Sequence, residues 1–270
     1  MDEFCSRLSQ IEQEERVYIF YACESGSRAW GFPSADSDYD VRFLYLRPKD
    51  WYLAIDLEEK RDVIERPLTD DLDLSGWDLR KALKLLRKSN PPLLEWLSSP
   101  IVYRENSIIT EKLRSLVPEF YSPIACAKHY LHMAQGNYRE YLRGDEIRIK
   151  KYFYVLRPLL AIRWIEEERD VMPMEFGRLV EKSIDSDTLK LEINQLLERK
   201  KAGQELDRGP RIQVISEYIE RELERLEAKL NVASREKPDS EKLNTFFRWA
   251  LNESEQYLRA NDADNHKTVN

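Results

Sequence analysis

The chain has 270 residues, of which 42% are hydrophobic and 34% are charged, and its formal net charge at pH 7 is −7. This length can bury a sizeable core and suggests two domains, while the apolar and aromatic content excludes a globally disordered chain. The acidic balance argues against sequence-blind coating of nucleic acid but leaves room for a local basic groove.

The cysteines and the N-terminus indicate the compartment. Cys5, Cys23 and Cys126 lie far apart and form no CxxC pair, so the sequence predicts neither a disulfide framework nor a zinc site. The first ten residues, "MDEFCSRLSQ", lack the pattern of a signal peptide, and no apolar run approaches about 18 residues. We therefore expect a cytoplasmic protein that does not span a membrane. The sequence leaves the oligomeric state open.

The first part of the chain predicts a helix followed by a small β-sheet. Residues 3–14 have the pattern of a short helix, and the apolar, aromatic run "RVYIFYAC" that follows is typical of a buried strand. The stretch "YDVRFLYL" alternates as a half-buried strand does, with Val41 and Phe43 on one face and Asp40 and Arg42 on the other. Two further strands are predicted in "KRDVIER" and "TDDLDLSGW".

Helical patterns dominate the rest of the chain. "WDLRKALKLLRKSNPP" predicts an amphipathic helix that ends at the Asn-Pro-Pro sequence, and β-type signals cease after "EWLSSPIVYREN". Further helices are expected at roughly 106–116, 122–142, 146–168, 173–183, 186–201, 210–232 and 239–258. We predict an α+β fold, with a small mixed β-sheet domain flanked by helices at 1–120, an all-α helical domain at 121–260 and a disordered tail at 261–270.

The segment between the first two strands, "ESGSRAWGFPSADSDYD", carries the strongest chemical signal. Asp38 and Asp40, spaced i, i+2, project to the same side about 6 to 7 Å apart at Cα, close enough to share a divalent ion. Their oxygens suit Mg²⁺, with Mn²⁺ as the alternative. Gly26 and Ser27 open a short helix expected through "SRAWG" and offer N–H groups and a hydroxyl to phosphate. The pattern predicts a site for a nucleoside triphosphate.

Each of these features taken singly has an ordinary explanation. A Gly-Ser pair at a strand end is most often a plain turn, and an Asp-Ser-Asp sequence is commonly a solvated loop. The signal lies in their order: strand, Gly-Ser, turn, Asp-x-Asp, strand. Neither GxxxxGK[ST] nor GxGxxG occurs in the sequence, so the phosphate loops of those two kinds are excluded.

Two stretches resemble known families. "GSRAWGFPSADSDYD" resembles the Gly-Ser…Asp-x-Asp signature of the DNA polymerase β-like nucleotidyltransferase superfamily. Residues 17 to about 105, with "DLDLSGWDLRKALKLLRKSNPPLLEWLSSPIVY", are similar to predicted nucleotidyltransferases found with bacterial and phage RNA-repair systems. The resemblance implies transfer of a nucleoside monophosphate to an acceptor hydroxyl, at an RNA terminus, with release of pyrophosphate. Transfer of AMP to a protein or a small molecule, and a noncatalytic nucleotide- or RNA-binding module, remain alternatives.

The superfamily resemblance also implies a third carboxylate on a later strand, as part of a two-metal catalytic site. Our prediction is Asp73, because the pattern "LDL" places its carboxylate on the face opposite Leu72 and Leu74. Asp71 shares that face and stays an alternative. Asp78 is the other alternative, although an acid in the first turn of a helix is favoured without any catalytic role.

Basic and aromatic residues complete the predicted nucleotide site. Lys150, Tyr154 and Arg157 fall at i, i+4 and i+7 of one predicted helix, a face that could grip a triphosphate and stack a base. The superfamily resemblance assigns such contacts to a closing helical domain, and here to Lys150, Lys151 and Tyr154. Arg28 and Arg42 are further candidate phosphate ligands, whereas Trp30 is interpreted as a packing residue. The competing interpretation is that these cations simply face water or form surface ion pairs.

Overall fold

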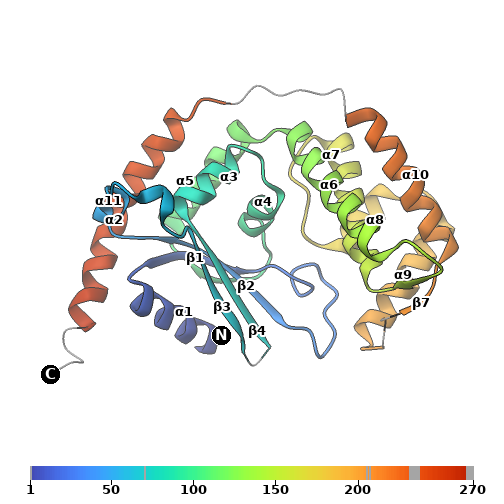
Figure 1. Ribbon diagram of the computed structural model, residues 1–270, viewed down its shortest axis with the longest axis horizontal. Coiled ribbons are helices and arrows are strands. Elements are labelled where there is room, and N and C mark those ends of the chain that lie inside the picture. The colour runs from blue at the N-terminus through green and yellow to red at the C-terminus, as the bar shows by residue number, and fades with distance from the viewer. Residues whose placement is uncertain (1, 70, 205, 207, 231–237, 266–270) are drawn as a thin grey trace.

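The computed structural model describes residues 2–69, 71–204, 206, 208–230 and 238–265. Two halves lie side by side, a β-sheet with helices around it and a bundle of helices (Figure 1). This arrangement confirms the predicted α+β class. Among the described helices, none combines the length and the apolar character that crossing a bilayer would require.

Five strands form the main sheet, in the order β3-β4-β2-β1-β5. They are β1 (Tyr18–Glu24), β2 (Tyr39–Leu46), β3 (Val63–Thr69), β4 (Leu72–Asp78) and β5 (Val102–Glu105). β2 and β4 pair in parallel and the other neighbours pair antiparallel, so the sheet is mixed, as predicted. The parallel register places Asp40 opposite Asp73.

The two faces of the sheet bury different cores, because side chains alternate along each strand. Helix α1 (Asp2–Glu15) packs on one face, where Val41 and Phe43 join Leu74 in one apolar cluster. Leu44 and Leu46 belong to the second cluster, on the opposite face. That face is covered by α3 (Leu79–Leu86), α4 (Pro91–Leu97) and α5 (Ser107–Phe120). The predicted alternation of β2 is confirmed, and it directs Asp40 and Arg42 away from α1.

The helical half contains α6 (Pro123–Tyr141), α7 (Lys151–Glu168), α8 (Phe176–Ser183), α9 (Asp187–Lys201) and α10 (Gln213–Leu230). Ser122 and Ser186 fix the starts of α6 and α9, because each side chain accepts a hydrogen bond from a backbone N–H of the first turn. The predicted helix from 146 was wrong at its start. Strand β6 (Glu146–Arg148) pairs there with β7 (Arg208–Pro210), a distant partner that local sequence does not reveal.

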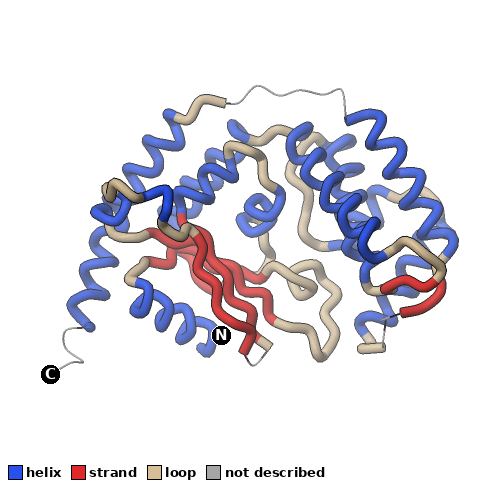
Figure 2. The backbone as a smooth tube through the Cα atoms, in the orientation of Figure 1, coloured by secondary structure: helices blue, strands red, loops and turns tan. Residues whose placement is uncertain are grey.

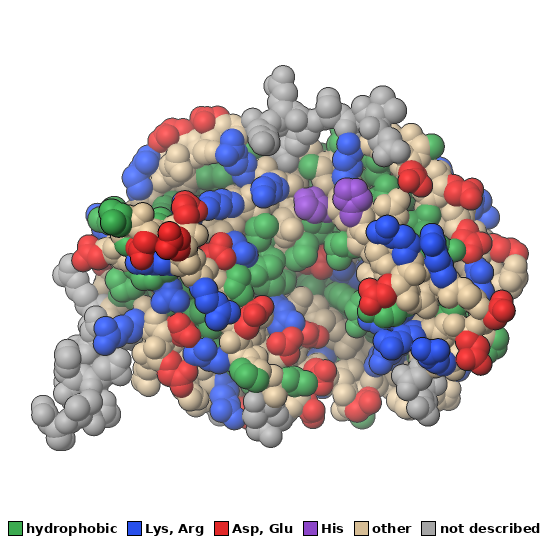
Figure 3. All heavy atoms as spheres, viewed as in Figure 1, with side chains coloured by type: hydrophobic (Ala, Val, Ile, Leu, Met, Phe, Trp, Pro, Cys, Tyr) green, Lys and Arg blue, Asp and Glu red, His purple; other side chains and the backbone are tan. Residues whose placement is uncertain are grey.

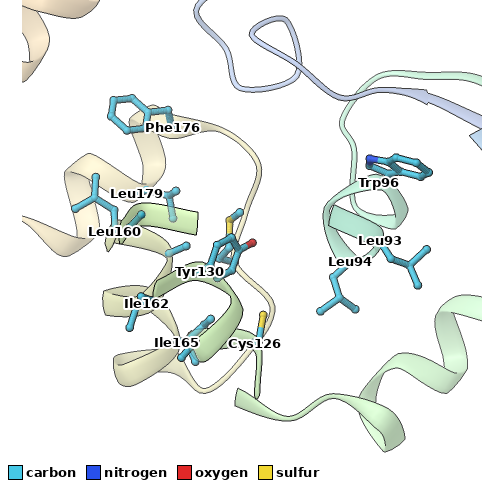
Figure 4. Packing of buried hydrophobic residues seen from close by; sticks show 14 of the residues in the cluster. Leu93, Leu94, Trp96, Cys126, Tyr130, Leu160, Ile162, Ile165, Phe176 and Leu179 are labelled. Carbon is cyan, nitrogen blue, oxygen red and sulfur yellow. The ribbon is translucent and has the colours of Figure 1, made fainter. Parts of the chain in front are cut away.

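One apolar cluster joins the two halves. Part of it appears in Figure 4, with Leu93, Leu94 and Trp96 of α4 on one side and Cys126 and Tyr130 of α6 on the other. α3 ends at Leu86, before the Asn-Pro-Pro sequence, and Asn90 caps α4, a second helix that the sequence pattern did not separate from the first. Short α2 (Lys49–Tyr52) and the 3-10 turn η1 (Leu57–Glu59) connect β2 to β3.

The last helix, α11 (Glu241–Asn265), lies against the sheet half and not in the bundle (Figure 2). The ring of Phe247 meets Tyr52 edge-on with centroids 5.0 Å apart, and Tyr257 stacks on Tyr18 at 4.5 Å. The predicted boundary near residue 120 stays a prediction, but this helix, assigned from sequence to 121–260, packs on the first half. Its backbone also continues to 265, inside the tail predicted to be disordered, while 266–270 lie outside the described residues.

Candidate active site

A cavity of about 550 Å³ opens between the loop after β1, the start of β2 and helices α7 and α9. It gathers seven of the residues predicted from sequence: Gly26, Ser27, Asp38, Asp40, Lys150, Lys151 and Tyr154. Acidic side chains gather on the sheet side of the hollow between the halves, and Lys and Arg side chains on the facing helical side (Figure 3). Carboxylates and lysines therefore face one another across a single opening.

The loop after β1 is a turn and not the short helix expected through "SRAWG". The N–H of Trp30 donates to the carbonyl of Gly26 at 3.0 Å, but Gly31 then adopts φ of 84°, which ends any helical path. Within the described residues, the backbone N–H groups of Gly26 and Ser27 donate to no protein acceptor. Both residues line the cavity, so these N–H groups can receive an anion.

The position of the Asp40 carboxylate requires a residue without a side chain at position 26. A Cβ atom at Gly26 would lie 1.7 Å from Oδ2 of Asp40, so the carboxylate rests against bare backbone. From sequence we expected a different role for this glycine, the close approach of a phosphate. The Asp40 backbone is fixed as well, because its N–H donates to Oε1 of the fully buried Glu24 at 2.9 Å. Tyr103 donates to the other oxygen of Glu24 at 2.5 Å.

Asp73 lies beside Asp40 on the neighbouring strand, and Arg42 lies between them. Nη2 of Arg42 donates to Oδ1 of Asp40 at 2.8 Å and to Oδ2 of Asp73 at 2.7 Å. Burial raises the pKa of Asp40; the Arg42 charge opposes this, and the charges of Asp73 and Asp38 add to it. Asp73 and Asp38 are thus both close enough to Asp40 for their charges to act on it. Leu72 and Leu74 are buried on the other face, as the "LDL" pattern requires.

The alternatives to Asp73 have other positions. Asp78 is buried at the far end of β4, where it accepts hydrogen bonds from the N–H of Arg80 and the hydroxyl of Tyr52, both at 2.7 Å, and caps α3. Burial raises the pKa of Asp78 to about 6. Asp71 is exposed in the turn between β3 and β4, with φ of 61°. Of the three acids, Asp73 has the position that the site geometry favours.

The donor set fits a small hard cation. Asp38 and Asp40 both line the cavity, and their carboxylates could hold Mg²⁺ or Mn²⁺, whose shell water and phosphate would complete. Among the described residues, however, no three His, Cys, Asp or Glu side chains are grouped so that they could hold a metal. A cationic nitrogen of Arg42, instead, occupies the position between Asp40 and Asp73.

Arg28 stabilises the loop before β2 that carries Asp36 and Asp38, which we call the acidic loop. Its Nη2 donates to the carbonyl of Ser37 at 2.7 Å, and its guanidinium lies 3.7 Å from the centre of the Tyr39 ring. It is not among the residues that line the cavity. Lys200 of α9 also contacts this loop, because its Nζ donates to Oγ of Ser34 at 2.6 Å. Unlike Arg28, Lys200 lines the cavity.

The predicted face of α7 reaches the cavity only in part. Lys151 places its ammonium 4.4 Å from the centre of the Tyr154 ring, and its pKa is lowered by burial and by neighbouring cations. Lys150 and Tyr154 line the cavity with it. Arg157 instead lies beneath Trp30, where it is buried and pairs with Glu95. Arg157, about one turn beyond Tyr154 on α7, therefore contributes to the packing between the halves and does not line the cavity.

Several residues of the cavity were not predicted from sequence, or were given another role there. Lys200 had no local signal, because its place depends on how α9 packs. Arg42, a candidate phosphate ligand from sequence, instead pairs with Asp40 and Asp73; it follows Asp40 by two positions on a strand and therefore shares its face. Trp30, interpreted as packing, both lines the cavity and covers Arg157.

Comparisons with known proteins show which family the chain belongs to. Residues 1–249 match the RlaP family model, described as the RNA repair pathway DNA polymerase beta family. The uncharacterised protein YcgL of Bacillus subtilis (strain 168) is 53% identical over 238 residues, which cover 88% of this chain and 91% of that protein.

A crystal structure of a nucleotidyltransferase-like protein from Exiguobacterium sibiricum 255-15 also matches, covering 83% of this chain and 78% of that one. Its identity of 13% and TM-score of 0.33 are too low to support a conclusion. The family match, which spans nearly all of the described fold, confirms the resemblance drawn from the Gly-Ser…Asp-x-Asp signature. The chain belongs to the RNA repair pathway DNA polymerase beta family.

Proposed function

We propose that this protein is a metal-dependent nucleotidyltransferase, which transfers a nucleoside monophosphate from a nucleoside triphosphate to an acceptor hydroxyl. The observation that carries the proposal is the cavity in which Asp38 and Asp40 face Lys150, Lys151 and Tyr154. A triphosphate needs cationic and N–H donors, and its transfer needs acids close to the α-phosphate. Membership of the family supports the same reaction class.

The proposed reaction is a single in-line displacement. The acceptor oxygen forms a bond to the α-phosphorus while the bond from that phosphorus to the α,β-bridging oxygen breaks, and pyrophosphate leaves with the bonding electrons. The hydroxyl proton passes to the carboxylate of Asp40, because this residue lines the cavity in which the nucleotide would lie. No covalent enzyme intermediate is required.

The remaining residues bind and orient the nucleotide. The N–H groups of Gly26 and Ser27 would receive the β- and γ-phosphate oxygens, and Lys150 and Lys151 would balance their charge. The exposed ring of Tyr154 is suited to stack on the base. Asp38 and Asp40 would hold Mg²⁺ or Mn²⁺, which when bound neutralises the triphosphate.

The proposed acceptor is an RNA terminus, in keeping with the description of the family. The test is incubation with ATP labelled at the α-phosphate, then with each other nucleoside triphosphate, in the presence of RNA and Mg²⁺. We expect label to enter the RNA with release of pyrophosphate, and Asp40→Asn to abolish both. Asp56→Asn is the control, because Asp56 pairs with Lys60 on the surface.

The same experiment separates the alternatives. Label in a protein or a small molecule would overturn the RNA assignment and leave nucleotidyl transfer standing. Failure of the wild-type protein to release pyrophosphate with any nucleotide and acceptor would overturn the enzyme proposal and favour a noncatalytic binding module.

A further inference from the structure

Arg42 occupies the place where a second metal ion would bridge Asp40 and Asp73. We propose that its guanidinium is a permanent counter-ion there, so that the site binds one divalent cation, held by Asp38 and Asp40. The proposal rests on the function proposed above for the identity of the site. It concerns the number of ions, which can be measured without any reaction.

The strand geometry places the guanidinium between the two acids. Arg42 follows Asp40 by two positions on β2 and so shares its face, and Asp73 lies opposite Asp40 on the adjacent parallel strand. One nitrogen, Nη2, donates to both carboxylates at 2.8 and 2.7 Å. Charge-assisted bonds of this length are among the stronger side-chain interactions.

The other guanidinium nitrogen fixes the group to the strands themselves. Nη1 donates to the carbonyl oxygen of Asp73 at 3.1 Å and to that of Val41 at 3.3 Å. The side chain is only 17% exposed. Moving it out of this position would break hydrogen bonds to two strands and leave the carboxylates of Asp40 and Asp73, 31% and 41% exposed, without their cation.

Charge distribution directs a metal ion to the other side of Asp40. Oδ1 of Asp40 is engaged by Arg42, whereas Oδ2 lies against Gly26, a residue that lines the cavity together with Asp40. Within the described part of the chain, Asp38 has no ion-pair partner and is exposed to solvent. A divalent cation between Asp40 and Asp73 would meet a fixed positive charge. One at Asp38 and Asp40 would meet the unpaired carboxylate of Asp38 and the oxygen of Asp40 that Arg42 does not contact.

Asp73 then acts as a positioning residue. It would hold Arg42 in place without coordinating metal, so its loss should alter the neighbourhood of Asp40 but leave the ion count unchanged. In a two-metal site with Asp73 as a ligand, the same loss would remove an ion.

The test counts bound Mn²⁺ by titration, using the electron paramagnetic resonance signal of the free ion. Full-length protein is titrated alone and with an ATP analogue that carries a methylene group between the α- and β-phosphates, after subtraction of ions bound by the free analogue. We expect one Mn²⁺ per chain for wild type, for Arg42→Lys and for Asp73→Asn. We expect two for Arg42→Gln, in which the acid pair is free.

Two bound ions in the wild type would overturn the proposal, as would a single ion in Arg42→Gln or loss of the ion in Asp73→Asn. Arg104→Gln is the matched control, because Arg104 pairs with Glu12 away from the cavity and its loss should keep the count at one. If Arg42→Gln does not fold, wild-type crystals soaked in Mn²⁺ give a second measurement. One anomalous peak at Asp38 and Asp40 supports the proposal, and a peak between Asp40 and Asp73 overturns it.

Failure of this proposal is distinguishable from failure of the proposed function. Two bound ions together with pyrophosphate release would overturn only the ion count. One bound ion together with complete absence of transfer would overturn only the reaction.

Discussion

Gly26 and Asp40 are in direct contact, with the carboxylate of the acid lying where a side chain at the glycine would stand. The contact joins the two ends of the sequence motif, the turn after β1 and the start of β2. It explains why the motif carries a glycine even though this residue does not adopt positive φ.

Gly26→Ala should therefore displace the Asp40 carboxylate, because the added Cβ would lie 1.7 Å from Oδ2. We expect transfer activity to fall by about a hundredfold, the usual effect of moving a catalytic group by about 1 Å. Initial rates of pyrophosphate release measure the loss. Gly136→Ala in α6 is the control, because a Cβ atom at Gly136 would meet nothing within 4 Å and activity should be kept. Equal rates for Gly26→Ala and wild type would refute the role of the contact.

Lys200 links α9 to the acidic loop through Ser34 and lines the cavity. Lys200→Ala removes a charge-assisted hydrogen bond and a cation facing the nucleotide, and we expect KM for the triphosphate to rise by about tenfold. Steady-state kinetics measure this change. Lys201→Ala gives the comparison, because Lys201 pairs with Glu198 on the surface. A similar KM for both variants would contradict the assignment.

The buried carboxyl of Asp78 makes stability depend on pH. Its pKa is about 6 in the folded protein, against an ordinary value of 3.8, because burial disfavours the charged form. Between these values the folded state binds more protons than the unfolded state, so the Asp78 contribution is full below about 4 and is lost as pH rises through 6. The total loss is about 3 kcal/mol.

Asp78→Asn keeps a helix-capping side chain and removes this titration. We expect the free energy of unfolding of the variant, relative to wild type, to rise between pH 4 and 6 and then stay level. Urea unfolding at a series of pH values measures it. A difference that does not change with pH would show that Asp78 titrates normally.

Arg157 and Glu95 form a buried ion pair across the two halves, 2.9 Å apart. Arg157→Met should destabilise the protein by about 3–5 kcal/mol, because it leaves Glu95 buried without its cation. Adding Glu95→Gln should restore part of that loss, since the carboxylate charge is removed while the hydroxyl of Tyr130 keeps an acceptor. Urea unfolding measures both variants. Arg178→Met, at an exposed pair, should change stability by no more than about 0.5 kcal/mol.

The parts that sequence could predict are those set by neighbours along the chain. The alternation of "YDVRFLYL" and of "LDL" fixed which faces carry Asp40 and Asp73, because side-chain direction in a strand follows position alone. Asn90 and the prolines after it showed, for the same local reason, that the helix begun at Leu79 must end before Pro91.

The parts that it could not predict depend on contacts between distant segments. Lys200 reaches Ser34 only because α9 packs beside the acidic loop, and β6 forms only because β7 pairs with it. The i, i+4, i+7 rule placed Arg157 with Lys150, but it could not show that Trp30 covers the third position. Helical spacing shows which residues share a face of a helix. Which part of that face is buried depends on the segment that packs against it.

The return of α11 to the sheet half sets an order for folding during synthesis. Tyr18 and Tyr52 find their aromatic partners in residues that leave the ribosome only after the whole bundle of α6 to α10 has been made. Part of the apolar surface of the nascent sheet therefore stays uncovered until α11 has been made, a state that favours chaperone binding. The helical bundle, whose segments follow one another closely, can assemble before α11 packs and can cover part of the sheet half through the apolar cluster that joins the two halves.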